Sequence, residues 1–152
     1  MDKNKSIDHQ LRATWQAVSK MYNEQATKHN STMATGFALL NIDAVTGTAS
    51  TSLGPLMGME STSLSRLLKS MEDKNLIYRD KNPNDGRSVI IKLTSYGKQM
   101  RQVSKSYVYQ FNNRVRDCIT SQELETFFKV IETINKLIAD KLVYNNTNKE
   151  AV

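Results

Sequence analysis

Short hydroxyl side chains and long cationic side chains are concentrated in residues 61–74. The residues with donors for an anion or a polar edge are Ser61, Thr62, Ser63, Ser65, Arg66 and Lys69. Apolar residues of the same stretch recur at steps of three or four, which predicts a helix whose buried face is Leu64, Leu67, Leu68 and Met71. Such a helix can lie in the major groove of B-DNA, where an arginine pairs with two atoms of a guanine edge. Taken alone, the pattern fits a solvated helix face equally well.

The surplus of positive charge falls in the same part of the chain. The 152 residues include 21 basic and 15 acidic ones, for a formal net charge of +6. Residues 61–101 hold nine basic and four acidic residues, a net charge of +5, whereas residues 1–60 are neutral and residues 102–152 carry +1. A surplus confined to one segment is typical of a surface that meets a polyanion.

The sequence offers no support for catalysis, and we expect no enzyme, cofactor or metal. His9 and His29 lie far from any cluster of cysteine or carboxylate residues, and no phosphate-binding or nucleophile motif is present. The single cysteine, Cys118, allows no intrachain disulfide and no cysteine-rich metal site. Asp117 beside it disfavours a reactive thiolate, so we interpret Cys118 as a buried, inert thiol, although a redox role stays open.

The polar N-terminus and the absence of a long apolar stretch predict a cytoplasmic protein that makes no contact with a membrane. The apolar pattern predicts helices over residues 6–29 and, from a cap at Thr35, through Val45. A short helix, residues 53–57, would be capped by Ser50, Thr51 or Ser52. A three-residue turn, Gly58-Met59-Glu60, separates it from the helix over residues 61–74, which Asn75 can end. Two helices joined in this way form a helix-turn-helix.

A β-hairpin is predicted next, because residues 76–79 and 88–93 are rich in β-branched and aromatic side chains and flank a run of turn formers. Its tip carries Lys81 and Arg87, and a basic loop of this kind can enter a minor groove. We expect Asp85 to fix the loop by pairing with Arg87 or with a backbone donor. The alternative is a solvated, mobile hairpin. Two more helices follow, one capped by Thr94-Ser95 and one opened by a capping box, Thr120 to Glu123.

The run from Leu53 to Gly97 resembles the winged helix-turn-helix of the MarR family of transcriptional regulators. The resemblance lies in Ser65-Arg66-Leu67-Leu68, Met71-Glu72, Asn75-Leu76-Ile77, Asp85-Gly86-Arg87-Ser88 and Leu93-Thr94-Ser95-Tyr96-Gly97. Its most specific part is the spacing from Asp85 and Arg87 to Leu93-Thr94. Asn75 stands where the family usually has Gly, and Gly54 where it usually has Ala.

The resemblance implies a mainly α fold with a small β-hairpin wing, in one domain spanning residues 1–152. Residues 34–94 would bind DNA, and residues 6–30 and 95–143 would form dimerisation helices. The first helix and the last helix carry more apolar residues than a domain this small needs for its own core. This agrees with the obligate homodimer that the resemblance implies, built from helices 1, 5 and 6. The alternative is that these residues form a core within one chain. The predicted DNA contacts are Ser50, Thr51, Ser52, Ser61, Thr62, Ser63, Ser65, Arg66, Lys69, Lys81, Asp85 and Arg87.

The family resemblance further implies a small lipophilic or aromatic anionic effector between the dimerisation and DNA-binding parts. We expect its walls to include Trp15, Met21, Tyr22, Met33, Phe37 and Tyr107, with Arg12 or His29 facing the anion. The function predicted from the sequence is therefore a repressor that binds a pseudo-palindromic operator as a homodimer and is released by a ligand. A winged-helix module that binds proteins and a nucleoid-like DNA binder of low specificity are the alternatives.

Overall fold

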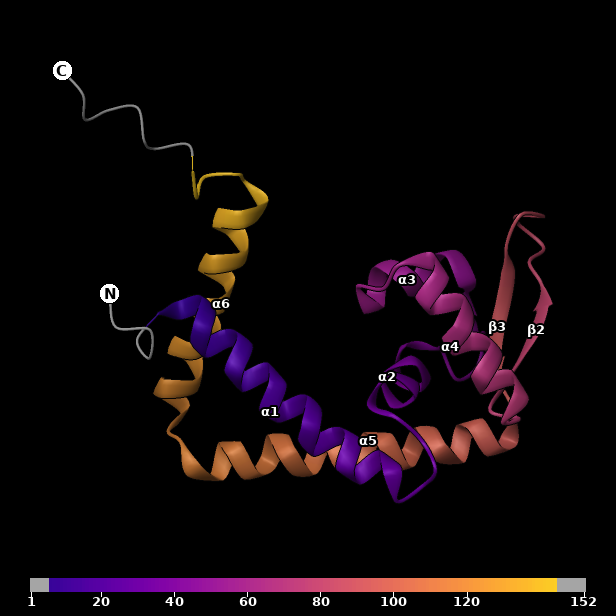
Figure 1. The fold of residues 1–152 in the computed structure, drawn as a ribbon, viewed down its shortest axis with the longest axis horizontal. Coiled ribbons are helices and arrows are strands. Elements are labelled where there is room, and N and C mark those ends of the chain that lie inside the picture. Colours follow the sequence, from indigo (N-terminus) through magenta and orange to yellow (C-terminus); the bar gives the residue numbers. More distant parts are fainter. Residues whose placement is uncertain (1–5, 145–152) are drawn as a thin grey trace. The chain divides into compact units, whose positions relative to one another are not determined.

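The computed structural model describes residues 6–144 and divides into two compact units, Met1–Val108 and Tyr109–Val152. The elements in the first unit are α1 (Ile7–Thr27), α2 (Met33–Asn41), β1 (Thr48–Ala49), α3 (Ser50–Met57), α4 (Ser61–Asp73), β2 (Ile77–Lys81) and β3 (Val89–Leu93) (Figure 1). Helix α5 (Ser95–Cys118) begins in the first unit and ends in the second, which also holds α6 (Ser121–Ala139). The predicted order of elements is confirmed, with one added strand.

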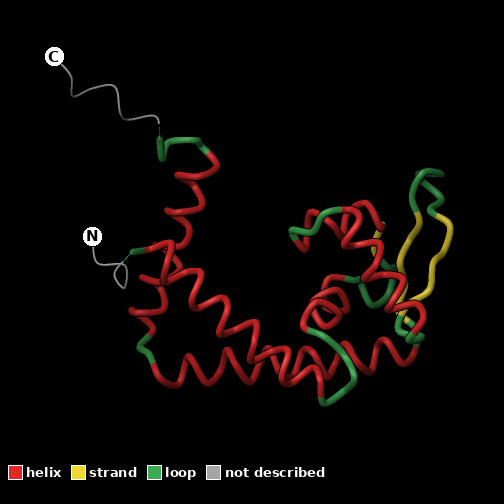
Figure 2. Tube along the Cα trace, in the orientation of Figure 1, coloured by secondary structure: helices red, strands yellow, loops and turns green. Residues whose placement is uncertain are grey.

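The sheet has three antiparallel strands in the order β1-β3-β2. Figure 2 shows its two long strands as a hairpin joined at one end by a loop. Strand β2 pairs with β3 from Ile77 opposite Leu93 to Lys81 opposite Val89, so the predicted hairpin is confirmed with a first strand that extends further toward the tip. Strand β1 was not predicted. It reaches β3 because Gly47 has a φ of 76°, and a Cβ there would lie 2.6 Å from the Ile91 carbonyl oxygen.

The hydrophobic core lies where α2, α3, α4 and the sheet meet. Its buried members are Ala38, Leu39, Ile42, Leu53, Leu64, Leu68, Met71, Leu76, Ile77, Ile91, Leu93 and Met100. Leu64, Leu68 and Met71 are the predicted inner face of α4, and Leu67 packs against the cluster while partly buried. The core thus fixes which face of α4 is left outside. Neither α1 nor α6 contributes a buried residue within the described chain.

Three predicted boundaries of α1 and α2 are wrong. Helix α2 begins about one turn before the predicted start. Its N-cap is Thr32, whose hydroxyl accepts from the Thr35 amide, and not Thr35, which is buried. The helix ends at Asn41 and does not reach Val45, because the Asp43 carboxylate binds the amides of Val45 and Thr46 in a turn. Helix α1 ends at Thr27 and not at residue 29.

The junction between α4, β2 and α5 is closed by backbone groups. Asn75 has a φ of 55°, and the amides of Asn75 and Leu76 bind the carbonyls of Glu72 and Met71, which ends α4 in a Schellman motif. The Thr94 hydroxyl lies 2.7 Å from the Asn75 carbonyl oxygen and accepts the Gly97 amide at 2.9 Å, so the predicted cap of α5 is confirmed. The end of α4 and the start of α5 are therefore tied directly to each other.

The second unit is described by itself. Its helix α6 opens with the predicted capping box: the Thr120 hydroxyl accepts from the Glu123 amide, and the Glu123 carboxylate accepts from the Thr120 amide. Those hydrogen bonds lower the pKa of Glu123. Phe127 and Phe128 pack edge to face against each other with ring centroids 5.5 Å apart, yet each is more than half exposed. An apolar surface therefore remains uncovered in this unit.

Candidate nucleic-acid interface

Helix α4 presents the predicted donors on its outer face. Ser61, Thr62, Ser63, Ser65 and Arg66 are exposed. The residue before the helix, Glu60, forms no side-chain cap, so the first backbone amides of α4 are left for another acceptor. Amides at a helix N-terminus suit a phosphate group. The face opposite the core thus combines hydroxyls, a guanidinium and backbone donors.

The turn between α3 and α4 has the predicted form. Gly58 takes the left-handed conformation, with a φ of 60°, and ends α3, so that Met59 and Glu60 complete the connection. Helix α3 begins at Ser50, and its N-cap is Ala49 without a side-chain bond. The predicted caps Ser50, Thr51 and Ser52 therefore lie inside the first turn of α3, because β1 carries the chain into the helix sooner than expected. Thr51 and Ser52 are exposed there, and Ser50 is half-buried.

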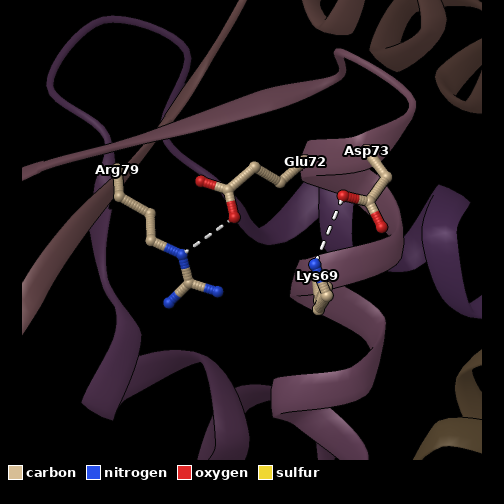
Figure 3. A network of polar contacts seen from close by, with 4 residues as sticks. All are labelled: Lys69, Glu72, Asp73 and Arg79. Carbon is tan, nitrogen blue, oxygen red and sulfur yellow. Dashed lines mark hydrogen bonds and ion pairs between the residues drawn. The ribbon is translucent and has the colours of Figure 1, made fainter.

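The acidic side chains of the basic segment all have partners. Glu72 accepts from the Arg79 guanidinium at 3.3 Å, and Asp73 lies 3.5 Å from the Lys69 ammonium, as Figure 3 shows. Asp80 pairs with Lys92 at 2.9 Å, and this hydrogen bond lowers the pKa of the Asp80 carboxyl. Three of the four carboxylates of residues 61–101 are thereby paired with a cation, and the fourth, that of Asp85, accepts a backbone amide.

Three cationic side chains of α4 and the hairpin are left without a partner among the described residues. These are Arg66 on α4, Lys81 at the end of β2 and Arg87 in the hairpin loop, all of them exposed. The pair of Lys69 with Asp73 joins two exposed side chains, so it is a weak interaction that a phosphate can replace. Arg79, by contrast, is held by Glu72. Free positive charge therefore lies on α4 and on the hairpin, and the exposed Lys98 on α5 adds a further cation of the segment without a partner among residues 6–144.

The hairpin tip, residues 82–88, is built by its own side chains. The Asp85 carboxylate accepts from the Arg87 amide at 2.9 Å, which is the backbone donor expected for it. Asn82 donates to the Ser88 hydroxyl at 2.7 Å and accepts from the Asn84 amide at 3.0 Å. These bonds give the loop a defined shape and leave the Arg87 side chain outside it.

One protein-family model matches part of the chain. Residues 32–89 match the model of the MarR family. The match covers less than half of the chain, so it is the segment from α2 to the start of β3 that is similar to this family. A curated relative, an uncharacterized HTH-type transcriptional regulator YxaD of Bacillus subtilis, is 29% identical over 82 residues, which are 54% of this chain and 57% of the relative. The matched segment thus spans little more than half of that protein.

Solved structures share the fold over most of the chain. The MepR–DNA complex of S. aureus has a TM-score of 0.78 at 17% identity and covers 86% of this chain and 97% of its own. The PcaV transcriptional regulator of Streptomyces coelicolor, in complex with its natural ligand, has a TM-score of 0.73 at 20% identity over 90% and 96% of the chains.

Most of the predicted effector residues gather around one cavity within the first unit. Tyr22, His29, Met33, Phe37 and Tyr107 line it. The His29 Nε2 atom lies 3.1 Å from the Tyr107 hydroxyl, and burial raises the pKa of Tyr22. We name this the first cavity. Its volume of ≈ 40 Å³ exceeds what one water needs, about 10–15 Å³, so a larger occupant requires its side chains to move.

Three predicted wall residues lie outside the first cavity. Arg12, Trp15 and Met21 are not among its lining residues, although Trp15 stacks on Phe37 with ring centroids 6.4 Å apart. Met100, Val103 and Ser104 of α5 line the cavity and were not predicted. Met100, Val103 and Tyr107 recur at steps of three and four residues, which is the period of one face of a helix. Assigning that face of α5 to the interior would have predicted Met100 and Val103 as residues that line the cavity.

Cys118 is exposed, so the interpretation as a buried thiol is wrong. It is the last residue of α5, in a stretch of the second unit where residues 112–118 are all exposed. Among residues 6–144, no cluster of His, Cys, Asp and Glu could hold a metal ion. No described helix combines the length and apolarity needed to cross a membrane.

Proposed function

We propose that this chain is a DNA-binding transcriptional repressor that binds a pseudo-palindromic operator as a homodimer. The observation that carries the proposal is the division of charge in the basic segment: its carboxylates are paired, whereas Arg66, Lys81 and Arg87 are free. Helix α4 of each subunit would enter a major groove with Arg66 and Lys69, and each hairpin tip would enter the flanking minor groove. The protein would act in the cytoplasm.

The salt dependence of duplex binding tests this proposal. Three free cations per subunit, six in a dimer, predict that log K falls with log salt with a slope of about −5. The measurement is a fluorescence-anisotropy titration with genomic duplex fragments from about 50 to 200 mM salt. Absence of binding at the lowest salt would favour the protein-interaction module. Equal affinity for all fragments would favour the nucleoid-like binder.

The uncovered apolar faces support the homodimer. On α1, Ile7 and Trp15 are 63% and 54% exposed, and on α6, Phe127 and Ile138 are 55% and 61% exposed. Faces of this kind normally mark an interface between subunits. Residues 34–94 would then form the DNA-binding part, and residues 6–30 and 95–143 the dimerisation part.

Phe127→Glu is therefore expected to convert the dimer to a monomer, because it places a charge in the apolar interface. Sedimentation velocity at micromolar concentration measures the change. Lys129→Glu is the control, since residue 129 lies two positions along α6 and so on another face of the helix. If both variants sediment as the unsubstituted protein does, α6 is not part of the interface.

The first cavity supports release from DNA by a small effector. Tyr22, Phe37 and Met33 offer an apolar wall, and the His29–Tyr107 pair offers polar atoms. Met33 and Met100 are adaptable side chains that can make room for an occupant. An effector with an aromatic or lipophilic body would fit these walls once the cavity opens.

A further inference from the structure

The ion pair between Lys69 and Asp73 lies on the outer face of α4. The Nζ atom of Lys69 is 3.5 Å from the Oδ1 atom of Asp73, and the two side chains are 74% and 64% exposed. Figure 3 shows Asp73 reaching back along α4 toward Lys69, whereas Glu72 reaches across to Arg79 of β2. The pair of Lys69 with Asp73 therefore belongs to the helix that carries the free Arg66, and it is open to solvent.

The position of Asp73 does not favour the stability of α4. Asp73 is the last residue of the helix, where a negative charge opposes the helix dipole. A lysine four residues before an acid is also the less favourable order for an ion pair along a helix. A pair between two exposed side chains contributes little to folding in any case. Residues that break such local rules are expected at functional sites, so we looked for a role of Asp73 in binding.

Pairing changes what Lys69 offers to DNA. The pair as a whole is neutral, so a duplex that is held loosely gains little from approaching it. A phosphate fixed at hydrogen-bonding distance can displace the carboxylate, because the pair is exposed and weak. Arg66 is exposed as well but has no acidic partner among residues 6–144, so it is available to any duplex. Lys69 thus differs from Arg66 in being available only on a condition.

We propose that Asp73 is a specificity-determining residue of the DNA-binding surface. It withholds Lys69 from loosely bound duplexes and releases it only to the fixed phosphates of the operator. The proposal rests on the proposed binding of DNA and deepens it, since specificity requires low affinity for the wrong partner as well as high affinity for the right one. The alternative is that Asp73 only repels DNA through its own charge, in which case Lys69 has no part in the effect.

Fluorescence-anisotropy titrations of the full chain with duplex poly(dI-dC), which contains no operator, test the proposal. Asp73→Asn is expected to bind about fivefold more tightly, and its slope against salt should become steeper by about two units, because one cation is released in each subunit of the dimer. In the Lys69→Gln background, Asp73→Asn should raise the affinity by less than about twofold and change the slope by less than about one unit. The comparison separates release of Lys69 from simple repulsion.

The genomic fragment that binds most tightly supplies the specific complex. Its phosphates already displace Asp73 from Lys69, so Asp73→Asn should raise this affinity by less than about twofold. The ratio of the affinities for this fragment and for poly(dI-dC) should therefore fall. Glu24→Gln is the matched control, because Glu24 is exposed on α1 and forms no ion pair among residues 6–144. It removes the same charge without releasing a cation and should leave the ratio unchanged.

Two results would overturn the proposal and leave the proposed binding of DNA intact. One is an equal gain in affinity from Asp73→Asn with and without Lys69, and the other is a ratio that stays the same or rises. Failure of every variant to bind any duplex at low salt would overturn both proposals. Misfolding does not confound the comparison, because both side chains are exposed. The urea midpoint of Asp73→Asn is expected to be no lower than that of the unsubstituted chain.

Discussion

Gly97→Ala is expected to destabilise the protein by about 3 kcal/mol or more, a large part of the stability of an ordinary domain. In an exposed helix interior the same change stabilises by about 1 kcal/mol, because alanine is the better helix former. Here the added Cβ would lie 1.9 Å from the carbonyl oxygen of Leu76 and 2.9 Å from its carbonyl carbon. These are backbone atoms at a hydrogen-bonded junction, so they cannot move aside as a flexible side chain would.

Urea unfolding followed by circular dichroism measures this loss. Gly86→Ala is the control, because a Cβ at Gly86 meets no atom within 4 Å and the residue has no positive φ. Its effect should stay within about 0.5 kcal/mol. A Gly97→Ala variant as stable as the unsubstituted chain would show that α5 can withdraw from Leu76 at little cost, contrary to the close packing described for this junction.

Arg87→Ala is expected to weaken operator binding by about tenfold or more, which corresponds to about 1.4 kcal/mol. Arg87 is exposed at the hairpin tip, and its backbone amide, not its guanidinium, is bound by Asp85. The substitution therefore removes a free cation and leaves the bonds that shape the loop. A gel-shift titration on the operator measures the affinity, and the slope against salt should become less steep by about two units, because the substitution removes one cation from each subunit of the dimer.

Arg79→Ala is the matched control for Arg87→Ala. It removes the same charge from the same hairpin, but the Arg79 guanidinium is held by Glu72 (Figure 3) and is less available to a phosphate. The loss of affinity should be several times smaller than for Arg87→Ala. Equal losses would mean that the net charge of the hairpin, and not the position of Arg87, determines binding, and this would remove the wing from the recognition mechanism.

Features encoded over a few neighbouring residues could be predicted from the sequence. The capping box from Thr120 to Glu123, the end of α4 at Asn75 and the loop contact of Asp85 each involve residues close in the chain, and all three are present. Strand β1 could not be predicted, because two residues carry no local signal and their extended form depends on pairing with β3. The misplaced start of α3 follows from the same missing strand.

The candidate site likewise combines features that neighbouring residues determine with features that depend on the tertiary structure. The free charge of Arg66 and Arg87 follows from their residue types, and the pair of Lys69 with Asp73 can be expected from a spacing of four along a helix. The pair of Arg79 with Glu72 joins a strand to a helix, so it required the tertiary structure. Likewise, the first cavity is lined by residues of α1, α2 and α5 and of the turn after α1, and no single one of these segments indicates it.

The hydrogen bonds of Thr94 have a mechanical consequence. The Thr94 amide binds the Leu76 carbonyl, its hydroxyl lies against the Asn75 carbonyl, and Gly97 leaves no gap beside Leu76. There is consequently no hinge between the first turn of α5 and the end of α4. A small rotation of that turn is therefore expected to change the orientation of α4. Any rearrangement that separates the two helix ends would have to break the bonds of Thr94, so flexibility within the first unit has to lie elsewhere.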